Sequence, residues 1–285
     1  MVLHYASPSV GTIVRVASLR RPDLVLRCTS YPNVVVDERV LSPVFDLIAP
    51  PSRMLALLVL EGEMFVETGG RTIRASAGNG IMLEAKLLAS ARHEKTTTLE
   101  LEWNAPETAP PESLRPFDVD RAAAIATELS APGSQRALLE RSFALCRELG
   151  VPLGHEIDRL EGSPTDRDRR IACAMEEQLA HLSSRATTFH LGESAKLSPR
   201  QLQRLLQDFN SRYGISARTW RDTRNRWRVQ IAAVMLSVPE LSIAAIAKEV
   251  GYASGNALAR ALVNAGLPSP VELRHRLLGT PACRG

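Results

Sequence analysis

Aromatic residues, cysteines and long apolar runs are all scarce in this chain of 285 residues, in which Phe, Trp and Tyr together make up 5%. The longest apolar run, Met54 to Leu60, is far too short to span a bilayer. The N-terminus, Met1 to Tyr5, lacks a basic region followed by an apolar stretch and a cleavage site. We therefore expect no signal peptide, no membrane association and a cytoplasmic location.

The four cysteines are widely separated and include no Cys-x-x-Cys pair. They are Cys28, Cys146, Cys173 and Cys283. This scatter argues against a disulfide framework or a cysteine zinc site, and it favours reduced, structural thiols in a cytosolic protein.

Charge is unevenly distributed, although the composition, 45% hydrophobic and 23% charged, is ordinary for a globular protein. The formal net charge is +4. From Ser163 onward 18 basic residues face 10 acidic ones, a net charge of +8, whereas the preceding part has 17 against 21, a net charge of −4. A chain of this length can hold two domains with separate cores, and the asymmetry indicates that only the C-terminal one meets nucleic acid.

Residues 1 to about 105 have the pattern of short strands joined by glycine turns. Met54 to Leu60 is expected to be a buried strand that a solvated turn, Glu61-Gly62-Glu63, interrupts before Met64 to Thr68 continues it. Gly69-Gly70 predicts a hairpin. The other predicted strands are Leu24 to Cys28, Val34 to Val36, Arg71 to Arg74, Ile81 to Leu83 after the turn Gly78-Asn79-Gly80, and, as the last, Thr96 to Trp103. This regular spacing is typical of a small barrel or sandwich.

A proline-rich connector and two helices occupy residues 106–162. The connector contains Pro106, Pro110, Pro111 and Pro116. Helical periodicity begins at Asp118 to Leu129 and continues at Ser134 to Leu149. The second helix has a wide apolar stripe, which fits either packing against the barrel or a dimer contact. Glu161 to Thr165 has the composition of a linker, and the basic domain begins near Asp166.

The basic part contains two helix-turn-helix patterns, a motif that places its second helix in the DNA major groove. In the first, a helix over Ser198 to Tyr213 has Ser198 as N-cap and Pro199 at its first position. One face is apolar and contains Leu202, Leu205, Leu206 and Phe209. The opposite face has no acid and consists of Arg200, Gln203, Arg204 and Gln207. Arginine pairs bidentately with guanine and glutamine with adenine, so we expect this row, with Ser198 and Gln201, to contact DNA.

In the second pattern, Ser242 caps a helix that Gly251 closes, and the next helix starts near Ser254. The residues expected to face inward are Ile243, Ile246, Ala247 and Val250 on the first helix, and Leu258, Ala261, Leu262 and Ala265 on the second. The outward face of the second helix offers Asn256, Arg260 and Asn264, interrupted by Ala259 and Val263. We therefore expect Ser254, Asn256 and Arg260 to contact DNA, more through the backbone than through base edges.

A connecting helix over Ser216 to Leu236 joins the two patterns. The residues expected to pack inward are Trp220, Trp227, Ile231, Val234 and Met235. Arginines crowd the remaining surface, namely Arg218, Arg221, Arg224, Arg226 and Arg228. We expect this helix to hold the two units rigidly, with its arginines either touching phosphates or serving packing and solubility.

Over roughly Asp166 to Arg276, the ordered set of these residues resembles the AraC/XylS family of bacterial transcription regulators. The resemblance is carried by Ser198, Leu202, Gln203 and Arg204, the turn Gly214-Ile215-Ser216, Ser242 to Ala247 with Gly251-Tyr252, and the closing Pro270 to Arg274. It implies a seven-helix domain whose two helix-turn-helix units face successive major grooves of an asymmetric site. It also implies an N-terminal cupin-like barrel that binds an effector or a partner protein, followed by helices that carry dimerisation.

The chain departs from the family pattern at several positions. Lys196 stands where the first turn usually has glycine, and Gly192 stands where a helix alanine is usual. In the second unit, Ala257-Leu258 replaces the usual aromatic pair and Leu262 replaces a phenylalanine. These changes leave the expected fold intact, and they bear on how deeply the second unit enters its groove.

A cupin-like barrel can also be an enzyme, when a His-x-His pair, a carboxylate and a later histidine hold a metal. Residues 1–105 contain only His4 and His93, and neither has a histidine two residues away. No Ser-His-Asp or Cys-His arrangement has an ordered context, and there is no phosphate-binding glycine loop. We therefore expect no catalysis, no metal and no cofactor.

We predict an α+β protein with a regulatory barrel at 1–105, a connector and dimerisation helices at 106–162, and a DNA-binding domain at 166–285. The barrel either senses a small-molecule effector or is packed solid and offers a surface to a protein partner. The residues that either line a pocket or fill the core are Phe65, Val66, Ile73, Ile81 and Leu83. We expect a homodimeric activator that binds promoter DNA and RNA polymerase; an architectural protein without signalling is the remoter alternative.

Overall fold

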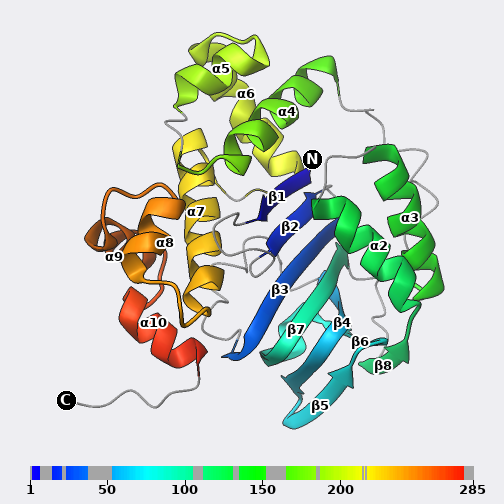
Figure 1. Ribbon diagram of the computed structural model, residues 1–285. Helices are drawn as coiled ribbons and strands as arrows, with labels where there is room; N and C mark the ends of the chain where they lie inside the picture. The colour runs from blue at the N-terminus through cyan, green and yellow to red at the C-terminus, as the bar shows by residue number, and fades with distance from the viewer. Residues whose placement is uncertain are drawn as a thin grey trace.

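The computed structural model describes residues 2–6, 15–20, 24–37, 53–104, 112–130, 135–151, 165–183, 187–213, 215 and 217–278. Strands dominate the first part of the chain and helices the second (Figure 1). The fold class predicted from the sequence, α+β with a β-rich part followed by an all-α part, is therefore confirmed. None of the described helices is both long and apolar enough to cross a membrane.

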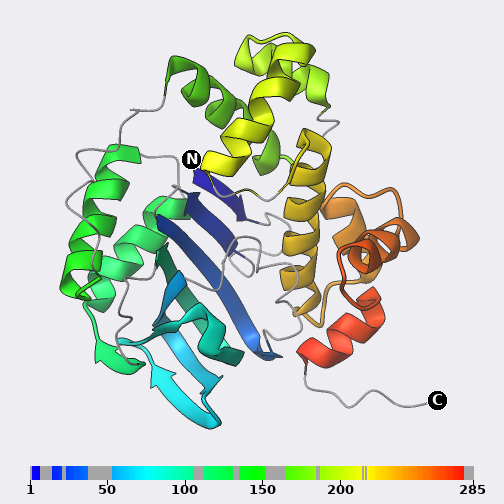
Figure 2. The ribbon, with the colours of Figure 1, turned by 180° about the vertical axis from the view of Figure 1, so that it is seen from behind.

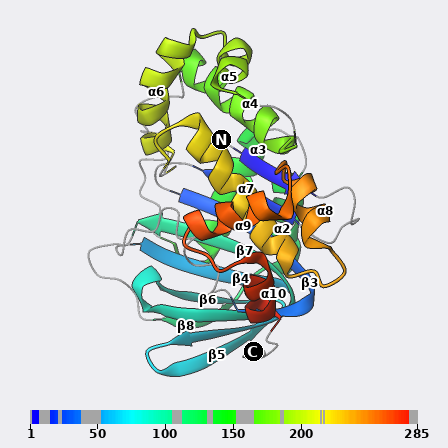
Figure 3. The same cartoon turned by 90° about the vertical axis from the view of Figure 1, so that its left-hand side faces the viewer.

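One antiparallel sheet contains all the described strands. They are β1 (Val2–Ala6), β2 (Arg15–Arg20), β3 (Leu24–Asp37), β4 (Arg53–Thr68), β5 (Arg71–Ser76), β6 (Asn79–Glu84), β7 (Leu88–Asn104) and β8 (Ser113–Pro116). Their order is β1-β2-β3-β7-β4-β6-β8, and β5 pairs with β4 beside this path. The sheet is strongly curved, and Figure 3 shows β6, β8 and β5 below β7 and β4.

The long strand β4 runs without a break through a segment predicted to be a turn. Glu61-Gly62-Glu63 lies inside β4, where the pairing with β7 shifts register twice. Gly62 has a φ of +76°, and a Cβ there would lie 2.2 Å from the carbonyl oxygen of Lys95 on β7. The predicted turn is therefore wrong. A bulge depends on the neighbouring strand, which the Glu-Gly-Glu sequence alone does not reveal.

Other strand predictions also change at their ends. Gly69-Gly70 forms the predicted hairpin turn between β4 and β5, with φ values of +53° and +79°. The two runs predicted between residues 24 and 36 form one strand, β3, with an irregularity between Tyr31 and Val35. Thr96 to Trp103 belongs to β7 and is not the last strand, because the connector contains β8, which pairs with β6.

Two helices, α2 (Val119–Ser130) and α3 (Gln135–Glu148), cover one face of the sheet. Their core with the sheet includes Met54, Leu58, Leu99, Leu101, Trp103, Ile125, Leu129, Leu138, Leu145 and Leu149. Cys28 and Cys146 are buried in the same core, whereas Cys173 is exposed and Cys283 lies outside the described residues. The apolar stripe of α3 therefore packs against the sheet, which is one of its two predicted roles, and a dimer contact stays a prediction.

Seven helices form the described chain after Thr165, the number that the resemblance implies. They are α4 (Asp166–Ala180), α5 (Thr188–Ala195), α6 (Pro199–Arg212), α7 (Trp220–Leu236), α8 (Ile243–Glu249), α9 (Gly255–Asn264) and α10 (Pro270–Leu277). They share one hydrophobic core, from Ile171 to Leu277, that is separate from the cores of the sheet. This part of the chain therefore has its own basis for stability.

The helix α7 lies at the centre of the core that the helices after Thr165 share. Its residues 229 to 236 are all buried, and Trp220 and Trp227 anchor its earlier turns. Figures 1 and 2 show α7 with α5 and α6 at one end and α8, α9 and α10 along its side. The helical part meets the sheet where α4 packs beside β1 and where α10 lies near β3.

Candidate nucleic-acid interface

The first helix-turn-helix unit consists of α5, the turn 196–198 and α6. Lys196 ends α5 in the left-handed conformation, with φ 54° and ψ 47°. The N–H of Leu197 donates to the carbonyl oxygen of Gly192 at 2.8 Å, and a Cβ at Gly192 would lie 2.8 Å from the carbonyl oxygen of Leu197. These two departures from the family pattern are therefore linked. The close approach requires glycine at 192, and the turn still needs the left-handed residue that Lys196 supplies.

Ser198 and Gln201 hold the start of α6 through a capping box. The Ser198 hydroxyl oxygen accepts a hydrogen bond from the Gln201 N–H at 3.3 Å. The Gln201 Oε1 atom accepts from the Ser198 N–H at 3.0 Å and from its hydroxyl at 2.9 Å. Both side chains are thus engaged in starting the helix, and contact of either one with DNA stays a prediction.

The two faces of α6 differ as the spacing predicts. Leu202, Leu206 and Phe209 are buried, and Leu205 is partly buried. The opposite face is exposed along its whole length at Arg200, Gln203, Arg204 and Gln207, which we call the α6 row. Asp208, the one acidic residue of the helix, lies beside this row and not within it. The row therefore presents two guanidinium groups and two amides to solvent over about two turns of helix.

The second unit consists of α8, the turn 250–254 and α9. Ser242 and Ser254 cap the two helices by accepting the N–H groups of Ala245 at 3.1 Å and Ala257 at 3.2 Å. Gly251, with a φ of +81°, closes α8, and the Tyr252 N–H donates to the carbonyl oxygen of Ala247 at 2.7 Å. Both units are thus built by the same capping chemistry, with glycine at the left-handed position only in the second.

The exposed face of α9 is poorer in hydrogen-bonding groups than the α6 row. Leu258 and Leu262 are buried, as predicted. Asn256, Arg260 and Asn264 are exposed, together with Val263, whose exposed fraction is 58%. This composition fits a helix that positions the protein on the phosphate backbone more than one that reads several base edges.

Two arginines predicted to lie on the surface of α7 point inward instead. Arg228 is buried, and Arg224 is partly buried. Both donate through Nη2 to the carbonyl oxygen of Leu182, at 2.6 Å and 3.0 Å respectively. They share a helix face with Trp220 and Trp227, so the spacing places them inside. The prediction that they lie on the surface was wrong because it followed the charge of arginine, which favours water, and not the spacing along the helix.

Burial changes the titration of this group of side chains. Burial, and after it the nearby charge of Arg228, lowers the pKa of Arg224 to about 10. Burial also lowers the pKa of Arg228 and raises the pKa of the Tyr252 hydroxyl. Both arginines remain protonated at neutral pH, so two positive charges are fixed between the helices.

A second candidate region is the face of the sheet opposite α2 and α3, which we call the inner face. Its apolar residues are Leu55, Leu57, Val59, Met64, Val66, Ala75, Ile81, Leu83 and Ala91. Side chains alternate along a strand, so Arg27 and Glu100, whose neighbours pack under the helices, also belong to this face. Arg27 Nε donates to Glu100 Oε2 at 3.1 Å. Arg53 Nη1 lies 3.9 Å from Glu102 Oε2. The apolar residues are all buried, and an apolar lining with a few charged groups is typical of small-molecule sites.

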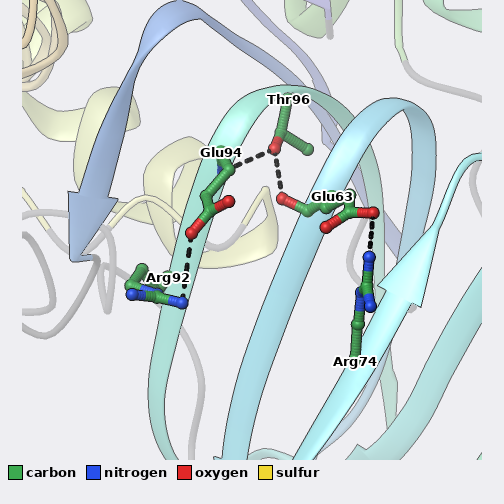
Figure 4. A network of polar contacts seen from close by, with 5 residues as sticks. All are labelled: Glu63, Arg74, Arg92, Glu94 and Thr96. Carbon is green, nitrogen blue, oxygen red and sulfur yellow. Dashed lines mark hydrogen bonds and ion pairs between the residues drawn. The ribbon is translucent and has the colours of Figure 1, made fainter.

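Phe65 is not part of the inner face, although the sequence prediction placed it there with Val66. The bulge at Gly62 and the strand alternation turn Phe65 outward, where the Arg92 guanidinium lies 4.5 Å and that of Arg74 5.9 Å from the ring centroid. Figure 4 shows how Glu63 and Glu94 pair with these arginines. The Thr96 hydroxyl donates to the carbonyl oxygen of Glu63 at 2.6 Å and accepts from the Glu94 N–H at 2.9 Å (Figure 4). This network closes the bulge and leaves its charges compensated.

No family model matches the chain, and no curated protein matches it. Similar solved structures include ToxT from Vibrio cholerae, with a TM-score of 0.37 and 8% identity over 90% of this chain and 99% of that chain. Wild-type ToxT bound to an unsaturated fatty acid has a TM-score of 0.35 and 9% identity over 92% and 98%. The Cnp3 cupin domain of Schizosaccharomyces pombe has a TM-score of 0.25 and 12% identity over 32% and 64%. These TM-scores are all below 0.5, so the functional assignment rests on the helices and side chains of this chain.

The observed architecture is a curved antiparallel sheet followed by two helix-turn-helix units that a long helix joins. It agrees with the architecture that the resemblance to the AraC/XylS family implies.

Proposed function

We propose that this protein is a sequence-specific DNA-binding regulator of transcription whose N-terminal sheet receives the regulatory signal. The observation that carries the proposal is the exposed α6 row on the second helix of a helix-turn-helix unit. Guanidinium and amide groups at this spacing match the major-groove edges of guanine and adenine. The net charge of +8 from Ser163 onward supports attraction to phosphates.

The two units have different tasks in this proposal. Arg200, Gln203 and Arg204 read bases, with Gln207, Ser198 and Gln201 beside them. Ser254, Asn256 and Arg260 hold the second unit mainly on the DNA backbone and leave it a short base-reading element, because the α9 face has fewer groups that match base edges. The binding site is therefore asymmetric, with more sequence information under α6 than under α9.

The finer features extend the resemblance to the AraC/XylS family. We propose a regulatory part at 1–105, connecting and dimerisation helices at 106–162 and a DNA-binding part at 166–285. The protein acts in the cytoplasm as a homodimer at promoters and activates transcription through RNA polymerase. The helices after Thr165 have a core of their own, which supports a DNA-binding part that begins at residue 166.

The regulatory signal, in this proposal, is a small molecule that binds at the inner face. The apolar cluster there lies beside two arginines and two glutamates, so the charges of the pairs balance. This favours a largely apolar ligand with at most one charged group over a sugar phosphate or another multiply charged anion. A protein partner is the alternative, and the tight burial of the apolar cluster favours it, because a filled core leaves only its outer surface for signalling.

The DNA-binding proposal is tested by selecting duplexes from a randomised library with the full-length protein. We expect enrichment of a motif with fixed bases, and binding that weakens steeply as salt rises. If no motif is enriched, or if binding does not depend on salt, the proposed function is wrong.

The effector proposal is tested by heat unfolding in the presence of a long-chain carboxylic acid, its methyl ester and a sugar phosphate. A ligand that binds the folded state raises Tm with its concentration. We expect a rise with the acid or the ester and none with the sugar phosphate. If all three leave Tm unchanged, the protein-partner alternative is favoured.

A further inference from the structure

The end of α4 and the turn that follows it are held by three side chains from one face of α7. Arg224 and Arg228 both donate to the carbonyl oxygen of Leu182, and Trp227 Nε1 donates to the carbonyl oxygen of Leu179 at 3.3 Å. The carbonyl of Leu179, in the last turn of α4, has no partner within the helix, and that of Leu182 belongs to the turn after it, so both are available for such bonds. The three donors are three and four residues apart, which brings them together on α7.

The turn of the second helix-turn-helix unit is seated on the same carbonyl oxygen. A Cβ at Gly251 would lie 2.3 Å from the oxygen of Leu182 and 2.4 Å from Nη2 of Arg228. The Arg228 guanidinium also lies 5.4 Å from the centroid of the Tyr252 ring. The backbone of the turn therefore approaches the carbonyl of Leu182, just after α4, as closely as glycine allows, and the Arg228 guanidinium lies beside both.

This contact connects the two units, because α4 packs directly on α5, the first helix of the first unit. We call Leu182, Arg224, Arg228, Gly251 and Tyr252 the carbonyl clamp. It joins segments that are far apart in sequence, since Arg228 and Leu182 are separated by 46 positions. The charged donors are partly or wholly buried, and charge-assisted hydrogen bonds of this kind are strong and directional.

We propose that the carbonyl clamp fixes the placement of the two helix-turn-helix units, and thereby the spacing of the two DNA elements that they read. This inference rests on the proposed DNA-binding function. Arg228 is a positioning residue, since its guanidinium is committed to Leu182 and Tyr252 and acts on DNA only through the turn at Gly251. One inserted base pair moves the two elements apart by about 3.4 Å and rotates one by about 35° around the DNA axis. Rigidly joined units do not follow such a change.

The test uses full-length protein and a duplex that the wild type has selected, with derivatives in which one base pair is inserted or removed between the two elements. We expect wild-type affinity to fall at least about tenfold for either change, the scale of a lost base contact or more. Arg228→Met should bind the original duplex more weakly and lose only about threefold or less on the derivatives, because its units adjust independently. Gly251→Ala should likewise reduce the loss of affinity that follows insertion or removal of one base pair, because its Cβ displaces the turn.

Arg169→Met is the matched control, since Arg169 is an exposed arginine at the start of α4 that pairs with Asp166 and does not touch the clamp. It should keep the wild-type spacing dependence. Cooperative heat unfolding shows that each variant is folded. If Arg228→Met does not fold, Arg228→Lys replaces it in the test. Lysine keeps a donor for the carbonyl oxygen of Leu182 but lacks the planar guanidinium that lies over the Tyr252 ring. We expect it to show an intermediate spacing dependence.

The two proposals fail in different ways. A wild type with no sequence preference would overturn both the DNA-binding function and the clamp. A wild type that selects a motif but tolerates both spacing changes would overturn the clamp alone. So would a folded Arg228 variant with the full wild-type spacing dependence.

Discussion

Arg204 and Arg260 are both exposed arginines on the second helix of a helix-turn-helix unit, but their neighbours differ. Arg204 stands in a row with another arginine and two glutamines, whereas Arg260 is surrounded by Ala259, Val263 and two asparagines. Bidentate groups that converge on one groove specify bases, while an isolated cation is better suited to a phosphate. We therefore expect the two residues to respond differently to the same substitution.

Arg204→Ala should lower binding free energy by about 1–3 kcal/mol and relax the base preference at one position of the site. The measurement is a competition titration against duplexes that carry each base at each position. Arg169→Ala, on the exposed surface of α4, should leave every base preference unchanged. Wild-type binding by Arg204→Ala would show that the recognition helix is wrongly placed.

Arg260→Ala should weaken binding evenly across sequences and reduce the slope of log K against log salt by about 1, because a phosphate contact carries no sequence information. The same titration at several salt concentrations measures both effects. A change in base preference would instead show that Arg260 reads a base.

At the scale of elements, the turn between α5 and α6 illustrates how local chemistry determines a helix boundary. Ser198 and Pro199 mark the start of α6 in the sequence, and the structure starts the helix there. Lys196 occupies the left-handed region, which costs a residue with a Cβ about 1–2 kcal/mol. The first unit therefore contains a conformational strain that the glycine at 251 avoids in the second.

Lys196→Gly should raise the free energy of unfolding by about 0.5–1 kcal/mol, since relief of the left-handed strain exceeds the entropy that glycine loses on folding. Urea unfolding of the full-length protein measures it. Gly192→Ala is the matched substitution in the same turn and should lower stability, because its Cβ would meet the carbonyl oxygen of Leu197. A less stable Lys196→Gly variant would contradict this view of the turn.

Elements defined by nearby residues were predictable from the sequence, and those defined by distant partners were not. The helix α6 and its two faces follow from Ser198, Pro199 and the spacing of leucines. The bulge at Gly62 depends on Lys95 of a neighbouring strand, so Glu-Gly-Glu resembled a turn. Arg228 seemed to be a surface residue because its partner, the carbonyl oxygen of Leu182, is distant in sequence. The capping role of Gln201 was missed too, although serine followed three residues later by glutamine is a capping-box signature.

At the scale of the whole molecule, the chain has a helical core that is distinct from the two cores of the sheet. The helices after Thr165 bury their apolar residues against one another, with α7 at the centre. Among the described elements, they meet the sheet where α4 packs beside β1 and where α10 lies near β3. A core of this kind supports independent folding.

We expect residues 166–285 alone to fold and to bind DNA with a strong salt dependence, because this part carries the positive charge. Far-ultraviolet circular dichroism and salt-dependent titrations of the fragment measure the two properties. Absent or salt-independent binding by a folded fragment would contradict the assignment of DNA binding to this part of the chain.

The most direct measurement is the ratio of the affinities of the full-length protein for its selected duplex and for a scrambled duplex of the same composition, at one fixed salt concentration. We expect the selected duplex to bind at least about a thousandfold more tightly, as is typical of specific DNA-binding proteins. Equal affinities would contradict sequence-specific recognition by the α6 row and leave only electrostatic attraction between a basic surface and phosphates.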